Sequence, residues 1–177
     1  MDEIIKFKSS LKLDANSSLK WNYRIPVPNK ISEQFKQSDK RIIYSINNDT
    51  KSIHAALMPD GSGGHYLMIN KDLRKKMSLK ENDSIEITIS KDNSAYGTFV
   101  PHEFNEVNEQ YPKGSKYFHS LTIGKQRTLL HLIAKPKSEE KRIEKAIIIF
   151  EYLETAHGSL DFKELNEAFK QSRFKKD

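Results

Sequence analysis

The chain contains no cysteine among its 177 residues. This absence excludes a disulfide framework, a thiolate zinc site and a cysteine nucleophile. Long apolar stretches are also missing, because no run approaches the roughly 20 residues that span a bilayer. Residues 1–8 alternate apolar and charged side chains, whereas a secretory signal requires an uninterrupted apolar stretch. We therefore expect a cytoplasmic protein without a membrane span.

Positive charge is concentrated in the C-terminal part of the chain. Residues 1–112 carry 16 Lys/Arg against 15 Asp/Glu, and residues 113–177 carry 14 against 9, so the net charges are +1 and +5. Such a bias is compatible with an anionic ligand or nucleic acid as the partner. The hydrophobic content of 36% suffices for a packed core.

Short alternating segments fill the first hundred residues. Ile5, Phe7 and Leu11 lie on one face of the first segment, as a half-buried strand requires. Strands are expected over residues 4–13, 19–25, 41–47, 53–58, 65–69, 84–90 and 96–100. This many short strands favours a barrel or a sandwich.

Two stretches of this half resemble copies of one unit. Residues 25–46 and 68–89 each contain a strand, an Asn-Lys pair, a short amphipathic helix and an alternating strand. Self-similarity of this kind indicates a duplicated strand–helix–strand unit, which is consistent with a barrel of pseudo-twofold symmetry.

The pattern becomes helical after Pro101, which suits a first helical turn. Helices are expected over residues 102–110, from Gly124 to Pro136, from the N-cap Ser138 to Gly158, and from Asp161 onward. The predicted class is α+β, with a small closed β-barrel over residues 1–100 and a helical domain over residues 101–177.

Basic residues of the helical half form a candidate anion site. Arg127, His131 and Lys135 follow one another at i, i+4 and i+8 on one helical face. A helical hairpin through Pro136 would bring them near the basic start of the next helix. The candidate contacts are Lys125, Arg127, Lys135 and Arg142. The alternative is that these basic residues form an ordinary solvent-exposed face. Neighbouring glutamates would then neutralise the cations through weak exposed ion pairs.

The loop over residues 59–65 is the most glycine-rich in the chain, and the backbone N–H groups of Gly61, Gly63 and Gly64 are a candidate anion nest. The loop lacks the spacing of a P-loop or a dinucleotide-binding fingerprint. A plain hairpin, in which glycine supplies positive φ, is the favoured alternative.

No catalytic constellation, cofactor motif or metal site is predicted. The six histidines lack the i, i+4 spacing with a flanking glutamate that marks a zinc helix. An enzyme would need an unrecognised small-molecule pocket between the two halves, near Tyr96, His102 and the glycine loop.

The segment Met68-Ile-Asn-Lys-Asp-Leu-Arg-Lys-Lys through Asp83-Ser-Ile-Glu-Ile-Thr88 resembles the strand, short helix and strand of AbrB-like swapped-hairpin transcription factors. Those proteins bind DNA as dimers, so the resemblance implies a regulator that uses Arg74, Lys75 and Lys76. Asn82 stands where that pattern has glycine.

The chain as a whole resembles the YdeI/OmdA family of bacterial bacteriocin-protection and porin-associated proteins, preceded by a small barrel domain of unknown function. The residues that carry this resemblance are Ile25-Pro-Val-Pro28, Ala56-Leu-Met-Pro59, Asn70-Lys71, Tyr96-Gly97, Phe118-His-Ser-Leu121, Gly124-Lys-Gln-Arg127 and Lys141-Arg-Ile143. It implies a closed barrel of the cradle-loop, double-psi-like type with a helical appendage, and it supplies no catalytic residues. Our first hypothesis is a non-enzymatic cytoplasmic binding or stress-protection protein.

Overall fold

The computed structural model describes residues 3–14, 22–35 and 40–174. The chain divides into two compact units, with Gly97 the last residue of the first and Thr98 the first of the second. We call them the β unit and the helical unit and describe each by itself. The predicted boundary lies at Val100–Pro101.

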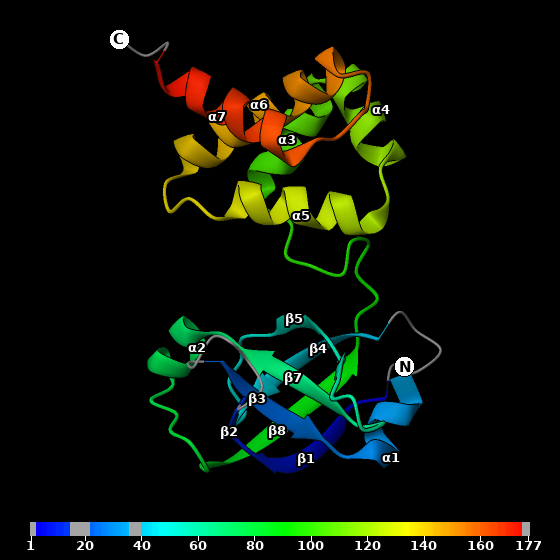
Figure 1. Cartoon of the computed structure of the whole chain (residues 1–177), viewed down its shortest axis with the longest axis vertical. Helices are drawn as coiled ribbons and strands as arrows, with labels where there is room; N and C mark the ends of the chain where they lie inside the picture. The colour runs from blue at the N-terminus through cyan, green and yellow to red at the C-terminus, as the bar shows by residue number, and fades with distance from the viewer. Residues whose placement is uncertain (1–2, 15–21, 36–39, 175–177) are drawn as a thin grey trace. The chain divides into compact units, whose positions relative to one another are not determined.

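The β unit consists of short strands with small helical turns between them (Figure 1). Its strands are β1 (Ile5–Ser10), β2 (Lys12–Leu13), β3 (Tyr23–Val27), β4 (Arg41–Ile46), β5 (Ile53–Ala56), β6 (Met58–Pro59), β7 (His65–Ile69) and β8 (Ser84–Lys91). Its helical segments are α1 (Asn29–Ser32), the 3-10 turn η1 (Glu33–Phe35) and α2 (Lys71–Lys76).

These strands form two open antiparallel sheets, with the orders β1-β8-β4-β5 and β2-β3-β7-β6. The predicted closed barrel is therefore wrong, although the α+β class and the helical C-terminal part agree with the structure. Closure requires the end strands of the two sheets to pair with each other. β1 and β3 are instead joined by a side-chain hydrogen bond, in which the Ser9 hydroxyl donates to the Pro26 carbonyl over 2.7 Å.

The two proposed repeats contain the expected strand–helix–strand order, and their corresponding strands pair with each other. β3 pairs with β7, so that Ile25 faces Leu67. β4 pairs with β8, so that Tyr44 faces Ile89. Alternate residues of these strands are buried and form the core of the β unit.

One predicted strand does not form. Residues 96–100 are a loop, in which Gly97 adopts a φ of 63°. The Arg41 guanidinium donates to the Gly97 carbonyl. An extended strand does not contain this left-handed φ, so residues 96–100 add no strand after β8, which ends at Lys91.

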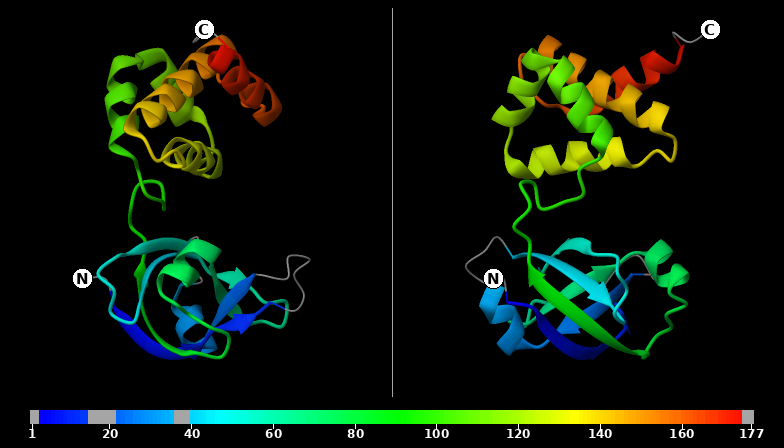
Figure 2. Two further views of the ribbon diagram at one scale, coloured as in Figure 1. Left: turned by 90° about the vertical axis from the view of Figure 1, so that its left-hand side faces the viewer. Right: turned by 180° about the vertical axis from the view of Figure 1, so that it is seen from behind.

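The helical unit contains α3 (His102–Gln110), α4 (Pro112–Ser120), α5 (Ile123–Ala134), α6 (Glu139–Thr155) and α7 (Phe162–Phe174) among its described residues (Figure 2). α6 packs against each of the other four. Three rings form the centre of the core, with centroids 4.8 Å apart for Phe104 and Phe118, and 6.0 Å apart for Phe118 and Phe150.

The sequence analysis missed α4. Pro112, two residues after the helix predicted over residues 102–110, occupies the first turn of a new helix, where its missing N–H costs nothing. Gly114 lies in this helix because a Cβ there would come within 2.7 Å of the Phe150 side chain.

Candidate functional site

The structure places the four predicted cations of the helical unit at different points. Lys125 and Arg127 lie in the first half of α5, and Lys135 is the residue at its C-terminal cap. Ten residues of helix separate Lys125 from Lys135, which corresponds to roughly 15 Å along the axis. His131, on the same predicted stripe, contacts the Thr98 hydroxyl at 3.4 Å.

The Arg142 guanidinium is held by hydrogen bonds to other groups of the helical unit. Its Nε donates to Glu103 Oε1 over 2.6 Å, and its Nη2 lies 2.5 Å from the same oxygen. Its Nη1 donates to the carbonyls of Pro136 and Lys137 over 3.2 and 2.8 Å. The guanidinium thus joins α3 to α6 and closes the turn between α5 and α6, and each of its three nitrogens has a partner within the protein.

Glu103, the partner of Arg142, is a buried carboxylate with 1% of its side chain exposed. Burial by itself raises the pKa of Glu103, but the hydrogen bonds to the carboxylate and the positive charge of Arg142 together outweigh burial, so the pKa lies below its ordinary value. The carboxylate is therefore charged at neutral pH and serves as an anchor for Arg142.

A groove of about 660 Å³ lies where the end of α5 and the start of α6 meet α7. It is lined by Lys135, Pro136, Lys141, Glu144, Lys145, Ile148, Phe169 and Ser172. We call it the lysine groove. Lys141 and Lys145 are one turn apart on the same face of α6.

The chemistry of the lysine groove suits an anion. Three lysines against one glutamate leave a local charge of +2. Lys145 Nζ lies 4.6 Å from the centre of the Phe169 ring, in cation–π geometry. Lysine ammonium groups bind phosphate as compact point charges with three donors each.

Only part of this groove was predicted. Lys135 was a candidate contact, and the basic start of the next helix, which contains Lys141 and Lys145, was expected near it. No signal in the sequence pairs α7 with the α5–α6 turn, because that contact depends on the direction in which the chain turns between α6 and α7.

The glycine loop connects β6 to β7 and already holds an anion of its own. Asp60 Oδ1 accepts hydrogen bonds from the N–H of Ser62 at 2.8 Å, from the Ser62 hydroxyl at 2.9 Å and from the N–H of Gly64 at 2.9 Å. These bonds, with the Ser62 N–H the largest cause, lower the pKa of Asp60. Of the three candidate N–H groups, that of Gly64 donates to Asp60, and the positive φ values of Gly61 and Gly63 fit the hairpin alternative.

The residues of the enzyme alternative belong to different units. Tyr96 and the glycine loop lie in the β unit, and His102 lies in the helical unit. His102 Nδ1 is 3.4 Å from Glu103 Oε2. Burial raises the pKa of Tyr96.

The AbrB-like segment has its expected form over β7, α2 and β8, but its basic residues differ in environment. Arg74 stacks on Tyr23, 4.2 Å from the ring centre, whereas Lys75 and Lys76 are exposed. Asn82 adopts a φ of 66°, the left-handed conformation that glycine usually fills. The departure from the AbrB pattern at this position is thus accommodated by asparagine.

Across the described parts of the chain, no cluster of three His, Asp or Glu side chains is arranged to hold a metal ion. Among the same residues, none of the helices combines the length and apolar character needed to cross a bilayer.

Residues 7–89 match the family model described as Domain of unknown function (DUF1905). The match begins in β1 and ends in β8, two strands that pair directly, so the matched segment coincides with the two sheets of the β unit. No curated protein matched the chain.

Proposed function

We propose that this protein is a non-enzymatic binding protein whose helical unit holds a phosphate-bearing ligand in the lysine groove. The observation that carries the proposal is the convergence of Lys135, Lys141 and Lys145 on one hollow with an aromatic side chain in its wall. Exposed lysines on separate faces would be ordinary solvated charges. Lysines that share a groove repel one another, and an anion between them removes that repulsion.

The same proposal includes the resemblance to the YdeI/OmdA family, with a cytoplasmic location in a bacterium and a protective role. The DUF1905 match supports it, since a small domain of unknown function is the expected N-terminal part. The positive charge of residues 113–177 supports an anionic ligand.

Fluorescence anisotropy on the full chain tests this function with two probes, a short labelled single-stranded RNA and a fluorescent ATP analogue. The double variant Lys141→Gln/Lys145→Gln is expected to weaken binding about tenfold or more. For the RNA, the slope of log affinity against log salt should fall by roughly 1.4, since two lysine–phosphate contacts are lost.

The matched control is Lys113→Gln/Lys116→Gln, which removes the same charge from exposed positions of α4. This control should bind as the wild type does. Equal losses in the two double variants would show that only net charge matters and would overturn the site. Binding of the RNA alone would identify a polynucleotide ligand, and binding of both probes would identify a nucleotide-sized site.

A further inference from the structure

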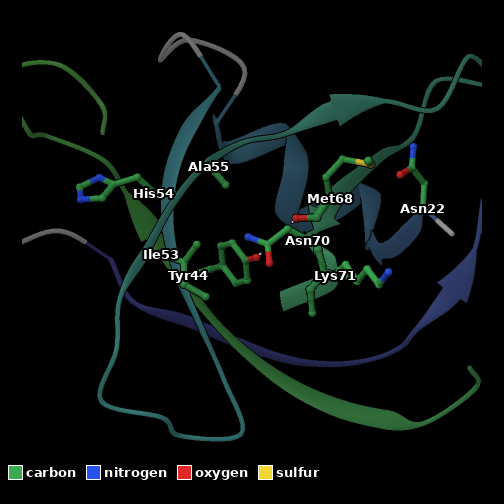
Figure 3. Close-up of a pocket in the computed structure, with 9 residues that line it drawn as sticks. Asn22, Tyr44, Ile53, His54, Ala55, Met68, Asn70 and Lys71 are labelled. Atoms are coloured by element: carbon green, nitrogen blue, oxygen red, sulfur yellow. Dashed lines mark hydrogen bonds between the residues drawn. The ribbon is translucent and has the colours of Figure 1, made fainter. Parts of the chain in front are cut away.

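A second hollow lies in the β unit, where the two sheets approach without pairing (Figure 3). Its volume is about 340 Å³. β5 ends one sheet, and β6 covers β7 only at His65 and Tyr66. Along Leu67–Ile69, no described strand pairs with β7 on the side away from β3. The hollow is thus a direct consequence of the open architecture.

Tyr44 brings a hydroxyl from the core to this hollow. The residue is only 2% exposed, and its hydroxyl donates to the Met68 carbonyl over 3.5 Å. This contact is much longer than the roughly 2.7–2.8 Å of a good O–H···O bond. Burial raises the pKa of Tyr44 to about 12, so the hydroxyl keeps its proton at neutral pH. A buried donor with so weak a partner has capacity for a better acceptor.

Other donors line the same hollow. The Met68 carbonyl faces the hollow. In an antiparallel ladder the N–H of a residue points to the same side as its carbonyl, so the Met68 N–H is one of these donors. Asn70 uses its Oδ1 to accept from the Leu73 N–H at 2.7 Å, which leaves the amide NH₂ as its other polar end. Lys71 adds an exposed ammonium group.

The remaining walls are apolar. Ile53, Ala55 and Ile69 line the hollow. His54 also belongs to the lining, but Figure 3 shows its ring directed away from the other labelled side chains. Its Nδ1 contacts Asp92 Oδ2 at 2.8 Å. The imidazole is thus occupied outside the hollow and does not make it a catalytic centre.

We propose that this hollow binds a small organic carboxylate, with the carboxylate held by Lys71 and the Tyr44 hydroxyl and the apolar stem against Ile53 and Ala55. The Tyr44 hydroxyl, the Asn70 amide NH₂ and the Lys71 ammonium are donors among the lining groups, and an acceptor with negative charge suits them. Its volume is near the lower limit of ligand sites and suits a small molecule. The site is separate from the lysine groove and does not depend on the function proposed for it.

Amide chemical shifts of the ¹⁵N-labelled full chain test this site, with butyrate as the probe and butyramide as its neutral isostere. Butyrate should shift the signals of Ile53–Ala55 and Met68–Lys71 along a saturating curve. Butyramide should bind at least about tenfold more weakly because it lacks the charge that Lys71 attracts.

Lys71→Gln should weaken butyrate binding about tenfold, and Tyr44→Phe by about threefold, while both spectra remain those of a folded protein. Lys75→Gln, an exposed position of the same helix, is the matched control and should leave the affinity unchanged. Shifts that do not saturate, equal binding of butyramide, or wild-type affinity in Lys71→Gln would overturn the proposal. Because Lys141→Gln/Lys145→Gln leaves this hollow intact, failure here is distinguishable from failure of the lysine groove.

Discussion

The two units bury their cores in different ways. The core of the β unit comes from alternate aliphatic residues such as Ile42, Ile85 and Ile87, on strands that lie side by side. The core of the helical unit surrounds the rings of Phe104, Phe118 and Phe150, with buried aliphatic residues of α5, α6 and α7 around them and a buried ion pair at its edge. The core of the β unit rests on the repeated alternation of buried residues along its strands, so that one core position resembles the next. The core of the helical unit depends on a few individual contacts, and single changes there should have larger and more local effects.

The largest effect is expected from Arg142→Ala, which leaves the Glu103 carboxylate buried without its partner. Breaking such a pair costs roughly 3 kcal/mol, at the low end for buried pairs because 22% of the Arg142 side chain is exposed. Hydrogen exchange should show lost protection in α3 and α6 and unchanged protection in β8. Equal loss in β8 would mean that the two units unfold together, which would break the comparison.

A smaller effect is expected from Gly114→Ala. The new Cβ would lie 2.7 Å from Phe150 side-chain atoms and 3.0 Å from its backbone oxygen, so α4 and α6 must move apart. Overpacking of this kind costs about 1–3 kcal/mol.

Gly124→Ala in α5 is the matched control, since no atom lies within 4 Å of its added Cβ. It should stabilise the helical unit by about 0.5–1 kcal/mol, because alanine favours a helix over glycine. Urea denaturation, followed by the circular dichroism of the helices, measures both variants. A destabilised Gly124→Ala would show that helix propensity does not explain the difference.

The smallest effect is a pH dependence that both units share. The pKa of Glu103 is lowered by Arg142 against the cost of burial, and the pKa of Asp92 is lowered by hydrogen bonds from Ser94 and His54 against the same cost. A lowered folded pKa adds stability that is complete above the unfolded value, about 4.3 for Glu and 3.9 for Asp, and is lost as the pH falls through the folded value.

Glu103→Gln should therefore flatten the acid slope of α6 protection without changing that of β8, and Asp92→Asn should do the reverse. The measurement is hydrogen exchange between pH 3 and 5, corrected for the intrinsic exchange rates. This range brackets the ordinary pKa values of Glu and Asp. Slopes that stay unchanged in both variants would show that neither carboxylate is a source of the acid sensitivity.

Much of the local structure was predictable. Alternation located the strands of both repeats, and their burial has the expected period of two. Asp161 caps α7 as predicted, since its Oδ1 accepts from the N–H groups of Lys163 and Glu164. The glycine after α6 was also expected, and Gly158 adopts a φ of 83° there.

The candidate sites were less predictable. Arg142 was chosen for its charge, and its partner Glu103 lies 39 residues earlier in the chain. The glycine loop was considered as an anion nest, but an aspartate within the loop occupies it. In both cases the residue type indicated a group that binds an opposite charge, but the sequence did not identify the residue that it contacts.

The sequence by itself determined the α+β class, the duplicated strand–helix–strand units and the ends of most helices, because alternation, caps, proline and glycine act over a few residues. Only the tertiary structure decided that the sheets stay open, that α4 packs its glycine on α6, and that Phe169 meets the lysines of the α5–α6 turn. These features depend on the meeting of segments that are far apart in the chain, and no periodicity within either segment records which partner it meets.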